Sequence, residues 1–183
     1  MTRKPMQRGR RIAFFGLGAV AVGAPALYWA SRPAALRSPA FGSTEGALRT
    51  LAALEAQPVR MGGAWDLAHV LHHAAQSVEY SLQGFPELKP GWFRASVGPA
   101  AATVFSARGR MSHSLTEPIP GAPDIAQGQP LAPAVDRAIA ALLAFERHTG
   151  ALQPHFAYGE LSKDDYRRAH LMHFANHWQE VVS

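Results

Sequence analysis

Apolar residues recur at helical spacing through most of the chain after residue 42. In residues 65–84, apolar side chains three or four positions apart share one face of a helix. The residues on this face are Leu67, Leu71, Ala74, Val78 and Leu82. With capping residues and with glycine or proline as stops, the same pattern predicts helices over residues 43–57, 65–84, 91–110, 132–148 and 162–182. No useful length of chain alternates between apolar and polar positions, so the fold is predicted to be all-α, a helical bundle.

Loops rich in proline and glycine separate these helices. The longest covers residues 112–131 and contains the sequence EPIPGAP, which is either a lid over a pocket or a rigid connector. Pro99 is expected to kink the third predicted helix. Ser162 and Asp165 resemble a capping box, with Asp in place of Glu or Gln, and mark the start of the last helix.

The first residues are predicted to form an export signal or a membrane anchor. Residues 12–30 are an uncharged run of 19 that follows Arg10 and Arg11. A basic stretch before an apolar one is typical of an export signal, and the paired arginines resemble a twin-arginine signal, although Gly9 stands where serine or threonine is usual. A helix of this length also nearly spans a hydrocarbon core of ~30 Å, so a retained anchor is the alternative.

This reading divides the chain into a signal or anchor (1–31), a linker rich in proline and small residues (32–42) and a helical body (43–183). Small residues around Pro25 and Pro39 offer two candidate cleavage sites. In either case the body is expected to lie outside the cytoplasmic membrane, in the periplasm or anchored to the membrane and facing outward.

Charge and cysteine content exclude several functional classes. Residues 1–40 hold seven Lys or Arg and no Asp or Glu, which leaves a net charge of −2 on the remaining residues. A body with that charge lacks the basic surface that binds phosphate backbones, so nucleic acid is excluded as a partner. Because the chain has no cysteine, disulfides, thiolate ligands and a cysteine nucleophile are excluded, and any metal must be bound by His, Asp, Glu or backbone oxygen.

Six of the nine histidines fall in two clusters on different predicted helices. They are His69, His72 and His73 on the second helix, and His170, His173 and His177 on the last. The second cluster lies on one helical stripe about 80° wide, with an apolar stripe beside it. Histidines one turn apart can point at one ion, and a third nitrogen from a neighbouring helix would leave a coordination position open for water.

The alternative is that these histidines lie on solvated helix faces or bond backbone carbonyls. All three histidines of the first cluster lie over 100° from the centre of their helix's apolar stripe. Spacing therefore does not select a third ligand and favours exposure, unless that helix has a second packing partner.

Other polar residues are weaker candidates for a pocket. They are Tyr80, Glu79, His113, Glu117 and His155, of which Tyr80 or Glu79 could carry a proton near an ion. The simplest interpretation of Trp65, Trp92 and Trp178 is core packing.

Three segments together resemble a known family. They are WDLAHVLHHAAQSVEYSLQGFP (65–86), EPIPGAP (117–123) and HFAYGELSKDDYRRAHLMHFANHW (155–178). In this order they are similar to the exported branch of the DinB/YfiT-like superfamily, catalogued as domain of unknown function 1569. The resemblance covers about residues 45–182.

The resemblance implies a DinB-like four-helix bundle that binds one divalent metal ion: zinc, nickel, iron or manganese. By motif, the implied ligands are His73, His173 and His177, with His72 as the competing position in the doublet. His72, His170 and Tyr80 are candidates for residues that support these ligands. The resemblance supplies no substrate beyond a small molecule, and it admits a homodimer because such proteins often pair.

Two hypotheses about function follow. The first is a metal-dependent hydrolase or transferase that uses a metal-bound water or a metal-polarised substrate. The second is a non-catalytic envelope protein that binds a metal or ligand. An open coordination position in a pocket would favour the first, and histidines spread over the surface would favour the second.

Overall fold

The structure is a computed structural model that describes residues 32–182. The predicted signal or anchor segment lies outside the described residues. The elements are α2 (Thr44–Ala53), β1 (Arg60–Met61), α3 (Leu67–Gln83), α4 (Gly91–Arg94), α5 (Val97–Arg108), α6 (Leu131–Arg147), α7 (Lys163–His177), the 3-10 helix η1 (Trp178–Glu180) and β2 (Val181–Val182). The predicted all-α class is confirmed, because helices make up most of the ordered structure.

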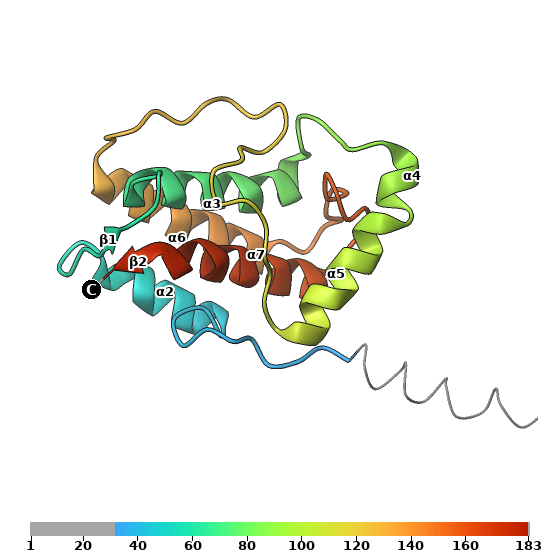
Figure 1. Cartoon of the computed structure of the whole chain (residues 1–183), viewed down its shortest axis with the longest axis horizontal. Coiled ribbons are helices and arrows are strands. Elements are labelled where there is room, and N and C mark those ends of the chain that lie inside the picture. The colour runs from blue at the N-terminus through green and yellow to red at the C-terminus, as the bar shows by residue number, and fades with distance from the viewer. Residues whose placement is uncertain (1–31, 183) are drawn as a thin grey trace, which may run out of the picture. The chain divides into compact units, whose positions relative to one another are not determined.

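Four helices pack around one apolar core. In Figure 1, α7 runs between α3 and α6 on one side and α2 on the other. The core side chains come from all four of these helices and include Leu51, Leu71, Val135 and Phe174. Phe41, from the segment before α2, stacks on Phe174 at 5.4 Å and closes the core beneath α7. Within residues 32–182, no helix is long and apolar enough to cross a bilayer.

Capping residues set where the long helices begin. The Ser43 hydroxyl accepts a hydrogen bond from Gly46 N at 3.1 Å and begins α2. The Ser162 hydroxyl likewise accepts from Asp165 N at 3.1 Å and begins α7. The capping box is therefore confirmed in part, since the Asp165 carboxylate accepts from the Ser162 hydroxyl at 2.6 Å rather than from its backbone N–H.

Two helices end earlier than their sequence patterns predict. The first ends at Ala53 instead of residue 57, and α7 ends at His177 instead of residue 182. After α7 the chain forms η1 and then β2, which pairs antiparallel with β1 through Arg60–Val182 and Met61–Val181. This short pairing replaces the last helical turn, because Gly62 N donates to Glu180 O at 2.7 Å and holds the C-terminal end against β1.

The predicted kink at Pro99 is wrong. The helix expected over residues 91–110 is instead broken at Ala95 and Ser96, between α4 and α5. Pro99 occupies the third position of α5, where a missing backbone N–H is tolerated because the first turn needs no intrahelical partner. α5 then packs closely on the loop before α7: a Cβ on Gly98 would lie 1.9 Å from Ala157 O.

The long loop between α5 and α6 crosses α7 and α3, as the yellow segment of Figure 1 shows. Ala122 N donates to Ile119 O at 3.0 Å, and Gly121 adopts a positive φ of 70° at the inner corner of this turn. Further along, Gly128 N donates to Asp66 Oδ2 at 2.6 Å, while Asp66 Oδ1 caps α3. The EPIPGAP segment is therefore fixed over the helices rather than extended into solvent.

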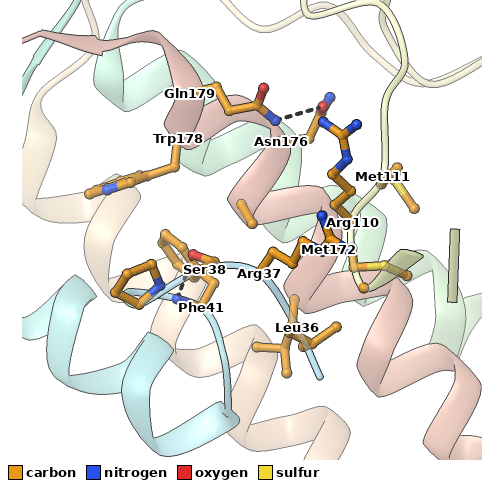
Figure 2. A pocket seen from close by; sticks show the side chains of 14 residues that line it. Leu36, Arg37, Ser38, Phe41, Arg110, Met111, Met172, Asn176, Trp178 and Gln179 are labelled. Carbon is orange, nitrogen blue, oxygen red and sulfur yellow. Dashed lines mark hydrogen bonds between the residues drawn. The ribbon is translucent and has the colours of Figure 1, made fainter. Parts of the chain in front are cut away.

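The segment that precedes α2 lies against α5 and α7. Ala34 N donates to Ser106 O at 3.0 Å, and Arg37 N donates to Gly109 O at 2.8 Å. This segment also borders a cavity of about 510 Å³ beside α7 (Figure 2). The cavity is lined by Leu36, Ser38 and Phe41, together with Arg110 and Trp178.

Candidate metal centre

The structure brings His73, His173 and His177 together. Each offers one nitrogen, and the three nitrogens lie within 4.8 Å of one another. The Nε2 atoms of His73 and His173 are 3.1 Å apart. Two nitrogens that bind one tetrahedral zinc ion at ~2.0–2.1 Å lie about 3.3 Å from each other, so this spacing suits a shared ion.

Helices α7 and α3 position these histidines in different ways. His173 and His177 are one turn apart on α7 and therefore share one face. His73 reaches them because α3 packs against both α6 and α7. The expected exposure of the first histidine cluster is wrong: His69 and His72 are 8% exposed and His73 is 3% exposed, since other elements cover the second side of α3.

His177 is completely buried, and neither of its ring nitrogens has a hydrogen-bond partner among the described residues. Leaving a buried polar atom without a partner costs roughly 1–3 kcal/mol, so such atoms usually indicate a missing ligand. An ion bound by His73, His173 and His177 would satisfy one of these nitrogens.

Electrostatics keep these imidazoles in the form that binds metals. Burial, with the nearby imidazoles of His113 and His69, lowers the pKa of His73 to about 3. Burial and the same kind of neighbour lower the pKa of His177 to about 3 and the pKa of His173 well below its ordinary value. All three side chains are neutral at neutral pH, so each has a lone pair available.

Trp65 and two further histidines surround the cluster. The Trp65 ring stacks on His69 at 4.2 Å and on His177 at 5.6 Å, so this residue packs against the site as well as the core. His113, from the long loop, contacts the rings of His173 at 5.0 Å and His177 at 5.6 Å while part of its own ring remains exposed. His113 therefore lies at the mouth of the cluster.

A cavity of about 220 Å³ adjoins the cluster, and His73 and His173 form part of its wall. The long loop contributes His113, Glu117 and Ile119, so EPIPGAP borders this cavity as a lid would. The rest of the wall includes Lys89, His155, Tyr158 and His170. An ion at the cluster would therefore face a space large enough for a small molecule.

Two histidines of the cavity wall have partners within the protein. His155 Nδ1 accepts hydrogen bonds from Ala157 N and Tyr158 N, both at 3.1 Å, so its proton is on Nε2. The Ser81 hydroxyl donates to Val78 O at 2.6 Å and accepts from His170 Nε2 at 3.2 Å. Burial lowers the pKa of His155 and of His170 to about 3.

The other candidate residues lie apart from the three-histidine cluster. His72 Nδ1 is 3.4 Å from the Arg137 guanidinium, which forms an ion pair with Glu79 at 2.7 Å. Tyr80 packs on Phe85 at 5.7 Å. Of the doublet, His73 thus joins the cluster and His72 faces α6. Trp178 packs on Phe41, whereas Trp92 is 68% exposed, so the expectation that it is a core residue is wrong.

Sequence patterns did not indicate three parts of the site. Lys89 and Tyr158 lie in loops without helical spacing, and Trp65 precedes α3, so no periodicity connects them with the histidines. These residues come together only in the tertiary structure, where loops and helices that are distant in the sequence meet.

Fold and site together define an all-α protein with a buried cluster of three histidines that could bind a metal ion. A family model described as protein of unknown function, DUF1569, matches residues 34–183, and the chain belongs to that family. No curated protein and no solved structure matches the chain.

Proposed function

We propose that this chain is an exported, DinB-like four-helix bundle that binds one divalent metal ion through His73, His173 and His177 and acts as a metal-dependent hydrolase or transferase. The observation that carries the proposal is His177, a fully buried imidazole with two unpartnered nitrogens at the meeting point of three neutral histidines. The sequence of residues 1–31, with its paired arginines and uncharged run, supports export or anchoring.

Three nitrogen donors support zinc, nickel, iron or manganese, since imidazole is a borderline donor that suits several of these ions. Such an ion, when bound with an open position, lowers the pKa of a bound water or polarises a substrate oxygen. The protein residues exclude bulk water and orient the substrate. The residues that line the cavity and could do so include Glu117 and Ile119 of the long loop, with Lys89, His155 and Tyr158.

The cavity favours an enzyme over a purely structural or storage site. A closed site would surround the cluster with protein on every side. Here His73 and His173 line a space of about 220 Å³, and His155 and Lys89 belong to its wall. The non-catalytic alternative, an envelope protein that binds a metal or ligand, gains support if metal binds and no small molecule enters this space.

Metal analysis of variants tests the ligand assignment. Protein produced without a polyhistidine tag is compared with His73→Ala and with the double variant His173→Ala/His177→Ala. His72→Ala is the matched control, because His72 precedes His73 in the chain but lies beside Arg137. We expect about one ion per chain in the natural protein and in His72→Ala, and almost none in the other two. Equal metal content in all four proteins contradicts the proposal, provided that circular dichroism shows each to be folded.

A further inference from the structure

α5 exposes an apolar face that no described element covers. Large hydrophobic side chains are exposed at only five positions within residues 32–182, and four of them fall between residues 88 and 104. These four are Leu88, at 42% exposure, Trp92, at 68%, Val97, at 48%, and Val104, at 43%. These four residues are concentrated in the α4–α5 region. Single exposed apolar side chains are common on protein surfaces, whereas clustered ones indicate an interface.

The outer side of α5 is continuous. At about 100° per residue, Val97, Ala100, Ala101 and Val104 share one stripe. Gly98 and Phe105 lie on the other side, toward the loop before α7 and the small apolar cluster around Met172. Apart from Arg108 at its end, α5 has no charged residue at all. A helix that is apolar on both sides is normally covered on both sides, and here only the inner side is covered.

Most charged residues around this face are basic, although the exposed Glu87 adjoins Leu88. Residues 32–44 and 88–116 together contain six Lys or Arg and no Asp or Glu. Arg37, Arg108 and Arg110 are exposed at the end of α5 and in the segment beside it. The carboxylates Glu160 and Asp165 line a cavity beside the inner part of α5 together with Arg168. An apolar stripe bordered by basic side chains suits an anionic lipid surface, and an exposed tryptophan suits its headgroup layer.

The point where the chain enters the body limits what can cover this face. Residues 34–37 are hydrogen-bonded to the last turn of α5, through Ala34 N to Ser106 O and Arg37 N to Gly109 O. The uncharged run ends at residue 30, four residues before Ala34. Four residues span at most about 14 Å, so the length of chain allows the C-terminal end of α5 to lie at a membrane that holds residues 12–30.

We propose that the outer face of α5, with Trp92 and Leu88 before it, docks on the anionic lipid surface of the membrane from which the body emerges. This inference rests on the proposed export and anchoring of the chain, and it is independent of the metal site. On this proposal the exposed Arg37, Arg108 and Arg110 face phosphate headgroups rather than a nucleic acid.

Site-specific labelling tests the docking face, because the natural chain has no cysteine and a single introduced cysteine can be labelled alone. Ala100→Cys and Ala140→Cys are a matched pair, since both residues are exposed alanines within helices, α5 and α6. The full chain, labelled with an environment-sensitive fluorophore, is placed in nanodiscs of phosphatidylglycerol and phosphatidylethanolamine with one chain per disc. Quenching by lipids that carry a nitroxide is then measured.

We expect lipid quenching at position 100 to exceed that at position 140 by about twofold or more, and Val104→Glu to reduce the difference. Equal quenching at the two positions overturns the proposal. A label at position 100 that is shielded from water without lipid quenching also overturns it and indicates the chain's own N-terminal segment as the cover. Shielding that appears only when discs hold two chains overturns it in favour of a second copy.

Flotation with vesicles separates this proposal from the one on which it rests. A chain that floats with vesicles but shows no preferential quenching at position 100 refutes the docking face and leaves anchoring intact. A chain that does not float with vesicles refutes both anchoring and the docking face.

Discussion

The buried histidines of this molecule differ in how many ring nitrogens have a hydrogen-bond partner; one buried nitrogen each of His69 and His72 has none, and both of His177 have none. His155 and His170 are buried with hydrogen bonds that fix which nitrogen carries the proton. His177 is equally buried, yet neither of its nitrogens has a partner within residues 32–182. A histidine retained for packing alone would be expected to resemble the first two, because an unpartnered buried nitrogen destabilises the fold. Among the buried histidines described, His177 is therefore the one that most directly supports the proposed metal site.

Replacing Ser81 tests how much the stability of the fold depends on one hydrogen bond in the cavity wall. Its hydroxyl is fully buried and accepts from His170 Nε2, so Ser81→Ala leaves a buried N–H without an acceptor. We expect a loss of about 1–3 kcal/mol in the free energy of unfolding, measured by urea denaturation at pH 7.5. Ser77→Ala is the matched control, one turn earlier on α3 and also buried, and we expect it to change stability by less than about 0.5 kcal/mol. Equal losses would show that His170 does not depend on Ser81.

At the scale of elements, sequence periodicity predicts which residues share a face of one helix, but it does not predict which residues other elements bury. The one-turn spacing of His173 and His177 was readable because both lie on α7. The burial of His73 could not be predicted from spacing, because the apolar stripe of α3 accounts for only one of the two sides on which α3 is packed. The resemblance of residues 65–86 to a known family selected His73, where spacing alone left His69, His72 and His73 equivalent.

The break between α4 and α5 shows the same limit. Pro99 is the obvious helix breaker in residues 91–110, but a proline in the first turn of a helix lacks no hydrogen bond. The chain instead breaks at Ala95 and Ser96, which carry no strong local signal. Ser96 is the N-cap of α5, and two residues later Gly98 approaches Ala157 O, a distant contact that the local sequence does not show.

Gly98 supports a test of that contact. A Cβ at this position would lie 1.9 Å from Ala157 O and 2.9 Å from Ala157 C, both backbone atoms that cannot rotate away. We expect Gly98→Ala to lower the free energy of unfolding by about 1–3 kcal/mol or more, despite alanine's higher helix propensity. In Gly91→Ala the new Cβ meets nothing within 4 Å, so this control should be neutral or slightly stabilising. Thermal unfolding of both variants by circular dichroism decides the matter, and similar shifts would refute the close contact.

At the scale of the whole molecule, the histidines link stability to pH. The pKa of each of His73, His155, His170 and His177 is lowered to about 3 in the folded protein, chiefly by burial. In the unfolded chain a histidine has an ordinary pKa of ~6.5. Between these values the unfolded state binds more protons than the folded state, so protonation favours unfolding. The stabilising effect of keeping these groups neutral is complete above pH ~6.5 and is lost progressively as the pH falls toward 3.

The free energy of unfolding should therefore fall steeply below pH ~6.5, by up to about 1.4 kcal/mol per pH unit for each such histidine. Urea denaturation of metal-free protein at half-unit steps from pH 7.5 to 4.5 measures this slope. His155→Gln removes one titrating group whose pKa burial lowers to about 3, so it should make the slope shallower. A profile that stays flat down to pH 4.5 would mean that these imidazoles take up protons alike in the folded and the unfolded chain, which would contradict their burial as neutral groups.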